Sequence, residues 1–114
     1  MKSKGRIVVL EDDPLILPLL ERWLGEAGYE VVAPTEDIKP ELVIANAPDP
    51  QSAEALVDSL RLQYAAPILL LSARFHSGIA GSVVAARRLG VKRVLPKPFS
   101  RKQLLAAVRA SVEG

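Results

Sequence analysis

The sequence predicts an α/β protein built on a parallel sheet with helices on both faces. Short apolar runs alternate with longer amphipathic ones along the chain, as they do where strands alternate with helices. Two of the short runs, residues 6–10 and 68–71, are almost entirely apolar, which is typical of strands buried on both faces. With 114 residues the chain can form a single hydrophobic core, so we expect one domain over residues 1–114.

The composition narrows the class of protein further. Apolar residues make up 49% of the chain and charged residues 25%, which is ordinary for a folded, soluble domain. The lack of cysteine and the single histidine argue against disulfides, thiol nucleophiles and transition-metal sites. No apolar run approaches the roughly 18 residues of a membrane helix. The amino terminus has no signal-peptide pattern, so we expect a cytoplasmic protein with no membrane partner.

A helix is expected after the first strand, residues 6–10. Asp13 can cap this helix, Pro14 suits its first turn, and Gly28 is a suitable stop. Pro18 has no N–H to donate, so the regular turns must begin near Leu15. Apolar residues at helical spacing define the expected inner face, with Leu15, Leu19, Trp23 and Ala27 in one row and Ile16, Leu20 and Leu24 alongside.

The rest of the chain continues the alternation of strands and helices. Further strands are expected at residues 29–33, 42–45, 68–71 and 93–95, and further helices at 51–64, 78–89 and 100–112, the last capped by Ser100. The run at 68–71 is nearly all apolar, so we expect this strand to be central in the sheet.

The connection between the second and third expected strands is unusually short. Only about seven residues, 34–40, join them, whereas a parallel crossover normally takes a dozen or more residues and contains a helix. Seven extended residues reach roughly 23 Å, enough to pass one strand, and two prolines in the segment disfavour a helix. We therefore expect this helix to be missing. An apolar strip beside the helix at 51–64 would then need cover from a partner, a second copy or the segment itself.

Polar side chains collect where the expected strands end, and open parallel sheets bind their ligands at the carboxyl ends of the strands. Glu11, Asp12 and Asp13 follow the first strand, Asn46 follows the third, Ser72 the fourth and Lys97 the fifth. Carboxylates, an amide, a hydroxyl and an ammonium at one edge are typical of a site for a hard divalent cation and an anionic group.

Four segments of the sequence resemble the response-regulator receiver family. They are Val8–Pro14 with the acidic residues, Glu41–Asn46 ending at the phospho-acceptor position, Pro67–Arg74 with the switch hydroxyl, and Leu95–Phe99 with the Lys-Pro pair. The resemblance covers nearly the whole chain, with all four segments in order. It implies a flavodoxin-like fold, a doubly wound five-stranded parallel sheet of order 2-1-3-4-5 whose second helix is largely missing here. It also implies a cis peptide bond before Pro98.

The resemblance further implies roles for the residues at the strand ends. Glu11 and Asp12 would bind Mg²⁺, with Asp13 beside them in the acidic pocket. Ser72 would hydrogen-bond a phosphoryl group, and Lys97 would pair with its charge.

Two positions depart from the family pattern. Asn46 stands where the family has the aspartate that attacks phosphorus, and a neutral amide is not a competent nucleophile for phosphoryl transfer. Its missing charge should also lower the affinity for Mg²⁺. Val94 stands where the family has an aromatic switch residue. We therefore expect no catalytic residue, no cofactor beyond weakly bound Mg²⁺, and signalling by protein contacts that do not depend on phosphorylation.

Several alternatives remain open at this stage. Asp49 is another carboxylate that could accept a phosphoryl group, although a loop residue that helps start the next helix is the plainer interpretation. Lys97 either leaves the carboxylates to a metal or pairs directly with Glu11 or Asp12 and neutralises the site. The segment Ser77–Ser82 either opens an anion-binding or nucleotide-binding helix or forms a glycine-rich loop.

Charge is divided unevenly along the chain. Residues 1–57 carry 11 acidic and 5 basic side chains, a net charge of −6, while residues 58–114 carry 2 acidic and 10 basic, a net charge of +8. The basic residues expected on the helix at 78–89, the strand at 93–95 and the helix at 100–112 are Arg87, Arg88, Lys92, Arg93, Lys97, Arg101, Lys102 and Arg109. By the resemblance, these elements form the surface that family members commonly use to dimerise or to contact an output domain. We expect an acidic protein partner there, such as a kinase, an output domain or a second copy. No recognition-helix motif favours nucleic acid.

Overall fold

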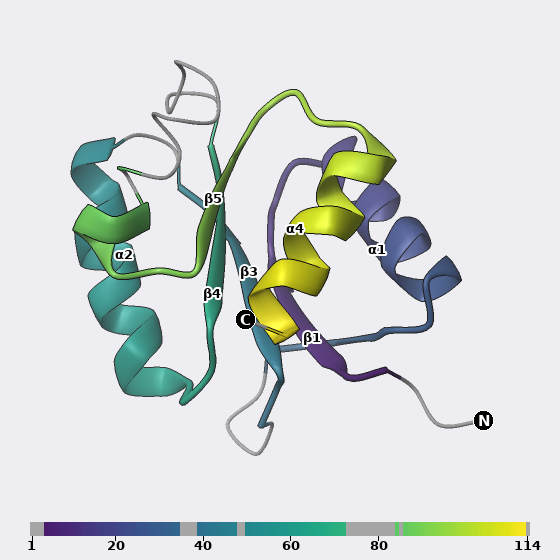
Figure 1. Cartoon of the computed structure of the whole chain (residues 1–114), viewed down its shortest axis with the longest axis horizontal. Coiled ribbons are helices and arrows are strands. Elements are labelled where there is room, and N and C mark those ends of the chain that lie inside the picture. Colours follow the sequence, from purple (N-terminus) through teal and green to yellow (C-terminus); the bar gives the residue numbers. More distant parts are fainter. Residues whose placement is uncertain (1–3, 35–38, 48–49, 73–83, 85, 114) are drawn as a thin grey trace.

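The computed structural model describes residues 4–34, 39–47, 50–72, 84 and 86–113. In chain order its elements are β1 (Arg6–Leu10), α1 (Ile16–Glu26), β2 (Glu30–Val32), β3 (Leu42–Asn46), α2 (Pro50–Gln63), β4 (Ile68–Ser72), β5 (Arg93–Pro96) and α4 (Arg101–Glu113) (Figure 1). Residues 84 and 86–89, between β4 and β5, are also helical. Across these described ranges, no helix combines the length and the apolar character needed to cross a lipid bilayer.

The five strands form one sheet of order β2-β1-β3-β4-β5, and each neighbouring pair is parallel. The expected strand order and strand direction are therefore confirmed. In this register Leu10 pairs with Ala45 and Ser72 pairs with Pro96. The carboxyl ends of four strands therefore lie together at one end of the sheet, which we call its carboxyl edge. The polar residues that follow or end these strands in the sequence, Glu11, Asn46, Ser72 and Lys97, lie there.

Helices cover both faces of the sheet. In Figure 1, α1 and α4 lie on one side of the strands, and α2 with the helical segment before β5 lies on the other. Each strand sends alternate residues to the two cores, so Ile7 packs with α1 and α4 while Val8 packs with α2. All five residues of β4 are buried, because this strand has a neighbour on each side and helices on both faces.

The start of α1 is fixed by Asp13. The Leu15 N–H donates to Asp13 Oδ1 at 2.8 Å, and the Asp13 carbonyl accepts the N–H of Leu17 at 3.0 Å. Asp13 thus closes a turn just before the helix, whose first regular residue is Ile16; the N-cap position is Leu15, which has no side-chain cap, so the expected cap at Asp13 was wrong by two residues. Pro18 falls in the first turn, where a backbone N–H has no partner within the helix.

Two other predicted helix boundaries, the end of α1 and the start of α4, are confirmed. At the end of α1, Gly28 has φ of +99°, its N–H donates to the Gly25 carbonyl at 3.1 Å, and the Tyr29 N–H donates to the Leu24 carbonyl at 3.0 Å. This is the Schellman arrangement, and its positive φ is the reason a glycine suits the position. At the start of α4, Ser100 Oγ accepts the Gln103 N–H at 3.1 Å while Gln103 Oε1 accepts the Ser100 N–H at 2.8 Å.

The expected inner face of α1 was partly wrong. Leu20 and Leu24 are fully buried, but Leu15 is 79% exposed and Leu19 is 42% exposed. Leucines occur around more than half of this helix, so spacing alone did not determine which row faces inward. Packing against the sheet and α4 selects the row that contains Leu20 and Leu24.

The short crossover between β2 and β3 occupies residues 33–41, and the described residues among them are not helical. The apolar strip expected to lie open beside α2 is not found among the described residues. Val8 is fully buried, and Leu10, Val32 and Leu56 are partly buried against the same core. The large apolar side chains that are exposed in the described part of the chain are Leu15 and Leu19 near the start of α1, Leu62 near the end of α2, and Val84.

Candidate functional site at the carboxyl edge of the sheet

The parallel register brings together residues that are far apart in the sequence. Glu11 directly follows β1, Asn46 is the last residue of β3, and Lys97 directly follows β5. The backbone N–H of Lys97 donates to the backbone carbonyl of Ser72 at 2.9 Å. This bond fixes the backbone after β5 against the end of β4. The Lys97–Pro98 peptide bond is cis, as the resemblance implied.

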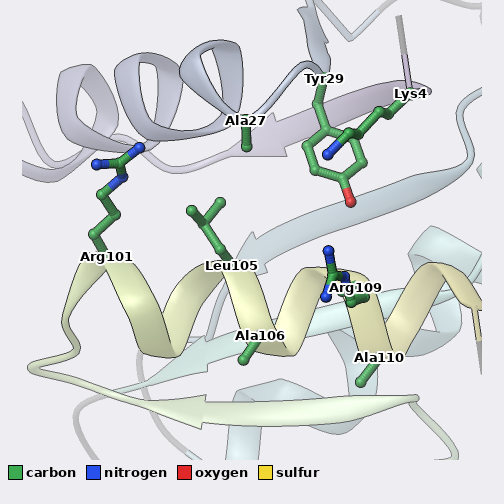
Figure 2. A pocket seen from close by; sticks show the side chains of 8 residues that line it. All are labelled: Lys4, Ala27, Tyr29, Arg101, Leu105, Ala106, Arg109 and Ala110. Carbon is green, nitrogen blue, oxygen red and sulfur yellow. The ribbon is translucent and has the colours of Figure 1, made fainter.

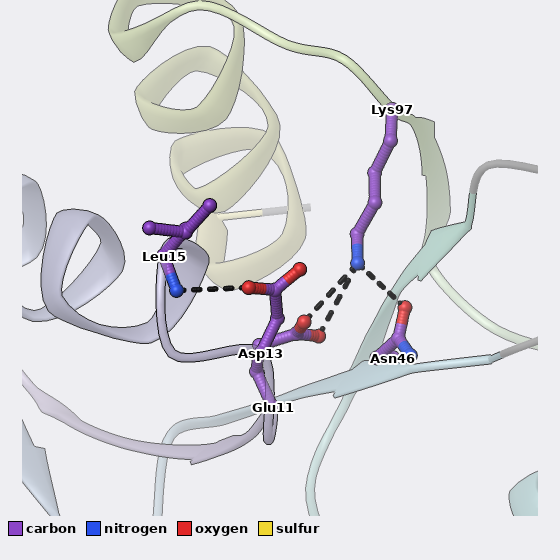
Figure 3. A network of polar contacts seen from close by, with 5 residues as sticks. All are labelled: Glu11, Asp13, Leu15, Asn46 and Lys97. Atoms are coloured by element: carbon purple, nitrogen blue, oxygen red, sulfur yellow. Dashed lines mark hydrogen bonds and ion pairs between the residues drawn. The ribbon is translucent and has the colours of Figure 1, made fainter.

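The centre of the site is the Lys97 ammonium. Its Nζ lies 2.8 Å from Asn46 Oδ1, 3.2 Å from Glu11 Oε1 and 3.4 Å from Glu11 Oε2 (Figure 3). The ammonium therefore donates to the carboxylate and to the amide at once. Of the two carboxylates considered as partners from the sequence, the structure places Glu11 against the lysine.

Burial makes this ion pair important for the site. The Glu11 side chain is only 1% exposed and the Lys97 side chain 15% exposed. A carboxylate removed from water needs a compensating charge or several hydrogen bonds, and Lys97 provides the charge. With Asn46 neutral, the three side chains together carry one negative and one positive charge, so the cluster is balanced.

The three consecutive acids separate into three environments. Glu11 points into the site, Asp12 is exposed to solvent, and the Asp13 carboxylate turns toward α1 and accepts the Leu15 N–H (Figure 3). The acidic pocket expected from the sequence therefore contains one buried carboxylate instead of three convergent ones. Asp13 differs from Glu11 because its carboxylate accepts the Leu15 N–H before α1, whereas the Glu11 carboxylate accepts from Lys97.

The side chains as placed do not fit a magnesium ion. Both Glu11 oxygens and Asn46 Oδ1 lie within hydrogen-bonding distance of the Lys97 ammonium, so a metal reaching them would have to displace it. Mg²⁺ also favours an octahedral set of oxygens that usually includes one or two carboxylates. Within the described ranges, no group of three or more His, Cys, Asp or Glu side chains is arranged to hold a metal ion.

Ser72 and Val94 lie inside the fold. Ser72 is fully buried at the end of β4, and no buried side-chain nitrogen or oxygen among the described residues lacks a hydrogen-bond partner. Val94 is 5% exposed and packs into the core on the α2 side. A small aliphatic side chain therefore fills the position that the resemblance assigned to an aromatic switch.

Curated relatives match this chain over nearly its whole length. PdtaR, a transcriptional regulatory protein of Mycobacterium tuberculosis, is 32% identical over 121 residues, which cover 94% of this chain and 56% of PdtaR. The transcriptional regulatory protein KdpE of the same organism is 31% identical over 117 residues, covering 93% of this chain and 50% of KdpE. The chain thus spans about half the length of these relatives. No family model matches the sequence.

Solved structures agree with the fold. A response regulator from Thermotoga maritima has a TM-score of 0.74 at 16% identity, with both chains covered completely. A response regulator receiver protein from Burkholderia phymatum has a TM-score of 0.71 at 22% identity, covering 96% of each chain. The fold is that of a response-regulator receiver domain, and the sequence is similar to these curated regulators over nearly the whole of this chain. The receiver domain of a Pseudomonas aeruginosa sensor histidine kinase, PA1611, solved with magnesium in its active-site cleft, has a TM-score of 0.69 at 20% identity, covering 98% of this chain and 100% of that one.

The basic residues expected to form a partner face are distributed over three elements of the fold. All six residues expected to form a partner face are exposed. Arg87 and Arg88 belong to the helical segment on the α2 side, and Arg101 and Lys102 belong to α4 on the opposite side of the sheet (Figure 1). Arg93 is the first residue of the edge strand β5, and Lys92 directly precedes it.

Two sequence predictions fall outside the described residues. Asp49, considered as an alternative phosphoryl acceptor, is one of them. The segment Ser77–Ser82, considered as an anion-binding helix start, is the other. The contact between Lys97 and the Asn46 amide was not predicted from the sequence, although both residues had been placed at the same edge.

Proposed function

We propose that this receiver domain is a signalling module that works through protein contacts and is not switched by aspartyl phosphate. The observation that supports the proposal most directly is the Lys97 ammonium held between Glu11 and Asn46. In this cluster the lysine takes the position of a counter-cation for the buried carboxylate. The charges balance without metal or phosphate.

The chemistry of residue 46 supports the same conclusion. Phosphoryl transfer to a receiver would require an oxygen nucleophile at this strand end, and the amide of Asn46 has no negatively charged oxygen to attack phosphorus. An aspartate in the same place would put two carboxylates beside one ammonium and leave a net negative charge. That excess charge is what a divalent cation would normally neutralise. We expect no catalytic turnover from this domain.

The partner proposed for this module is an acidic protein surface that meets the basic residues around β5. Six exposed cations there would attract acidic partners and make the association salt-dependent. The partner could be a kinase, an output domain or a second copy of the chain, and each of these would be recognised by the same charge.

Incubation with acetyl phosphate and Mg²⁺, followed by intact-mass spectrometry, tests the proposal. We expect no mass gain for the natural sequence. A gain of about 80 Da, the mass of one phosphoryl group, would contradict it. Peptide mapping would then show whether Asp49 or another carboxylate carries the phosphate. The Asn46→Asp variant is the matched control, since it restores a carboxylate and leaves the rest of the edge unchanged.

A further inference from the structure

The exposed surface of α2 carries a short row of acidic residues. Glu54 and Asp58 lie one turn apart on this helix, and both side chains are exposed. Leu62 continues the same row one turn later and is 92% exposed. Arg61, the one basic residue of α2, donates through Nη2 to the backbone carbonyl of Gly90. The row is therefore an acidic stripe that ends at an exposed leucine.

The helical segment at residues 84 and 86–89 carries positive charge beside this stripe. Arg87 and Arg88 are exposed, and Val84, three and four residues before them, is 65% exposed. The buried residues Ala86 and Leu89 pack in the same core cluster as the buried residues of α2. The segment and α2 thus lie side by side on one side of the sheet (Figure 1), and their exposed surfaces form one face with opposite charges on its two halves.

These charges are not paired with each other within one copy. Among the described residues, neither Glu54 nor Asp58 forms an ion pair with Arg87 or Arg88, and the ion pairs found there join other residues. A face with an acidic half and a basic half is complementary to itself. A two-fold axis that runs between two copies can place α2 of each copy against the helical segment of the other.

We propose that this chain pairs with a second copy of itself through the α2 face, which consists of Glu54, Asp58, Leu62, Val84, Arg87 and Arg88. Each acidic stripe then meets two arginines of the other copy, and the contact occurs twice because the interface is symmetric. Leu62 and Val84 are the large apolar side chains of this face, and the pairing removes them from water.

A second copy fits this face better than another acidic protein does. An acidic surface of a different protein would complement Arg87 and Arg88, but it would bring its own carboxylates close to Glu54 and Asp58. The phosphates of a nucleic acid would be repelled in the same way. Only a surface with both charges in the complementary arrangement suits both halves. The inference rests on the proposed function, since it names the partner that Arg87 and Arg88 contact.

The other side of the sheet offers a place for control substitutions. A groove of about 620 Å³ lies there between α1 and α4, with Lys4, Tyr29, Leu105 and Arg109 among its lining residues (Figure 2). It takes no part in the proposed pairing. Glu21 of α1 is an exposed acid on that side of the molecule, so changing it alters the net charge without touching the α2 face.

Sedimentation equilibrium of the full chain tests the proposal, because a dimer has twice the chain mass of 12.3 kDa. The natural sequence is expected to form dimers whose dissociation constant rises about fivefold between roughly 50 and 300 mM salt. Asp58→Arg is expected to raise the dissociation constant at least about tenfold, since it places two like charges in each half of the interface. Glu21→Arg makes the same change of charge and should alter it less than about twofold.

Two further variants separate the α2 face from general charge attraction. A chain with Glu54→Arg, Asp58→Arg, Arg87→Glu and Arg88→Glu keeps the net charge and exchanges the two halves of the face. It is expected to dimerise within about threefold of the natural sequence. Leu62→Ser leaves every charge in place and should weaken the dimer about fivefold, with an unchanged circular dichroism spectrum because the side chain is exposed.

The proposal is overturned if the natural sequence stays monomeric up to about 0.5 mM, or if Glu21→Arg and Asp58→Arg weaken the dimer equally. It is also overturned if the charge-exchanged chain does not dimerise. A monomer that takes no phosphate from acetyl phosphate would refute this interface and leave the proposed function standing. A chain that accepts phosphate and still dimerises through the α2 face would refute the proposed function and leave the interface standing.

Discussion

The Lys97 ammonium donates to the side-chain oxygen of Asn46 across 2.8 Å, joining the residue after β5 to the last residue of β3. The same ammonium contacts the buried carboxylate of Glu11. Because residue 46 is neutral, one lysine is sufficient to balance the charge at the carboxyl edge of the sheet. The stability of this site and its affinity for Mg²⁺ should therefore depend on the identity of the side chains at positions 46 and 97.

Replacing Lys97 with methionine should destabilise the fold by about 3 kcal/mol, because it leaves the Glu11 carboxylate buried without a counter-charge. The free energy of unfolding from urea titration measures the effect. Glu11→Gln should cost less than about 2 kcal/mol, since the glutamine oxygen still accepts from Lys97 and the lysine keeps some contact with water. If both variants lose the same free energy of unfolding, the loss does not come from leaving the Glu11 carboxylate without a counter-charge, and this interpretation is wrong.

Changing Asn46 to aspartate should raise the affinity of this site for Mg²⁺. The new carboxylate would lie beside Glu11 and Lys97 and add the negative charge that a divalent cation requires. Isothermal titration with MgCl₂ compares the two chains, and Asn46→Ala serves as the control for loss of the amide. If the natural sequence binds Mg²⁺ as tightly as the aspartate variant, the balanced-charge interpretation is wrong.

The buried row of α1 should carry most of the stability that this helix contributes. Leu20→Ala is expected to cost about 3 kcal/mol, because it leaves a cavity at a fully buried position. Leu15→Ala removes the same atoms from a side chain that is 79% exposed and should change stability by less than about 0.5 kcal/mol. Chemical denaturation gives the free energy of unfolding of both variants. If the two variants lose similar stability, Leu15 faces the core after all, as the sequence predicted.

Two glycines of the α1 region should respond oppositely to alanine. A Cβ at Gly25 meets no other atom within 4 Å, so Gly25→Ala should stabilise the protein by about 0.5 to 1 kcal/mol through lower entropy of the unfolded chain. Gly28 has φ of +99°, where alanine is strained, so Gly28→Ala should destabilise by about 1 kcal/mol. Thermal unfolding reports both shifts, which should have opposite signs.

Much of the fold was predictable because its signals are local. Gly28 ends α1 because a glycine takes the positive φ that follows the last turn at little cost, and Ser100 caps α4 through a bond that spans three residues. The apolar runs of β1 and β4 identified buried strands for a similar reason, since a strand covered on both faces needs no polar alternation.

The candidate site was predictable only as a set of residues. The order of strands and helices placed Glu11, Asn46, Ser72 and Lys97 at the same edge, because parallel strands end together. Which carboxylate the lysine contacts depended on side-chain direction after β1, which sends Glu11 inward and leaves Asp12 in solvent. The row of α1 that faces the core depended in the same way on packing against α4 and the sheet.

The sequence by itself determined the class of fold, the strand order through its resemblance to receivers, and the neutral residue at position 46. These features reside in short segments and in residue identity. Only the tertiary structure decided that Lys97 contacts Glu11 and Asn46 together, and that Lys4, Tyr29 and Arg109 line one groove. Both arrangements join residues far apart in the chain, and their geometry follows from the packing of whole elements, which no local pattern encodes.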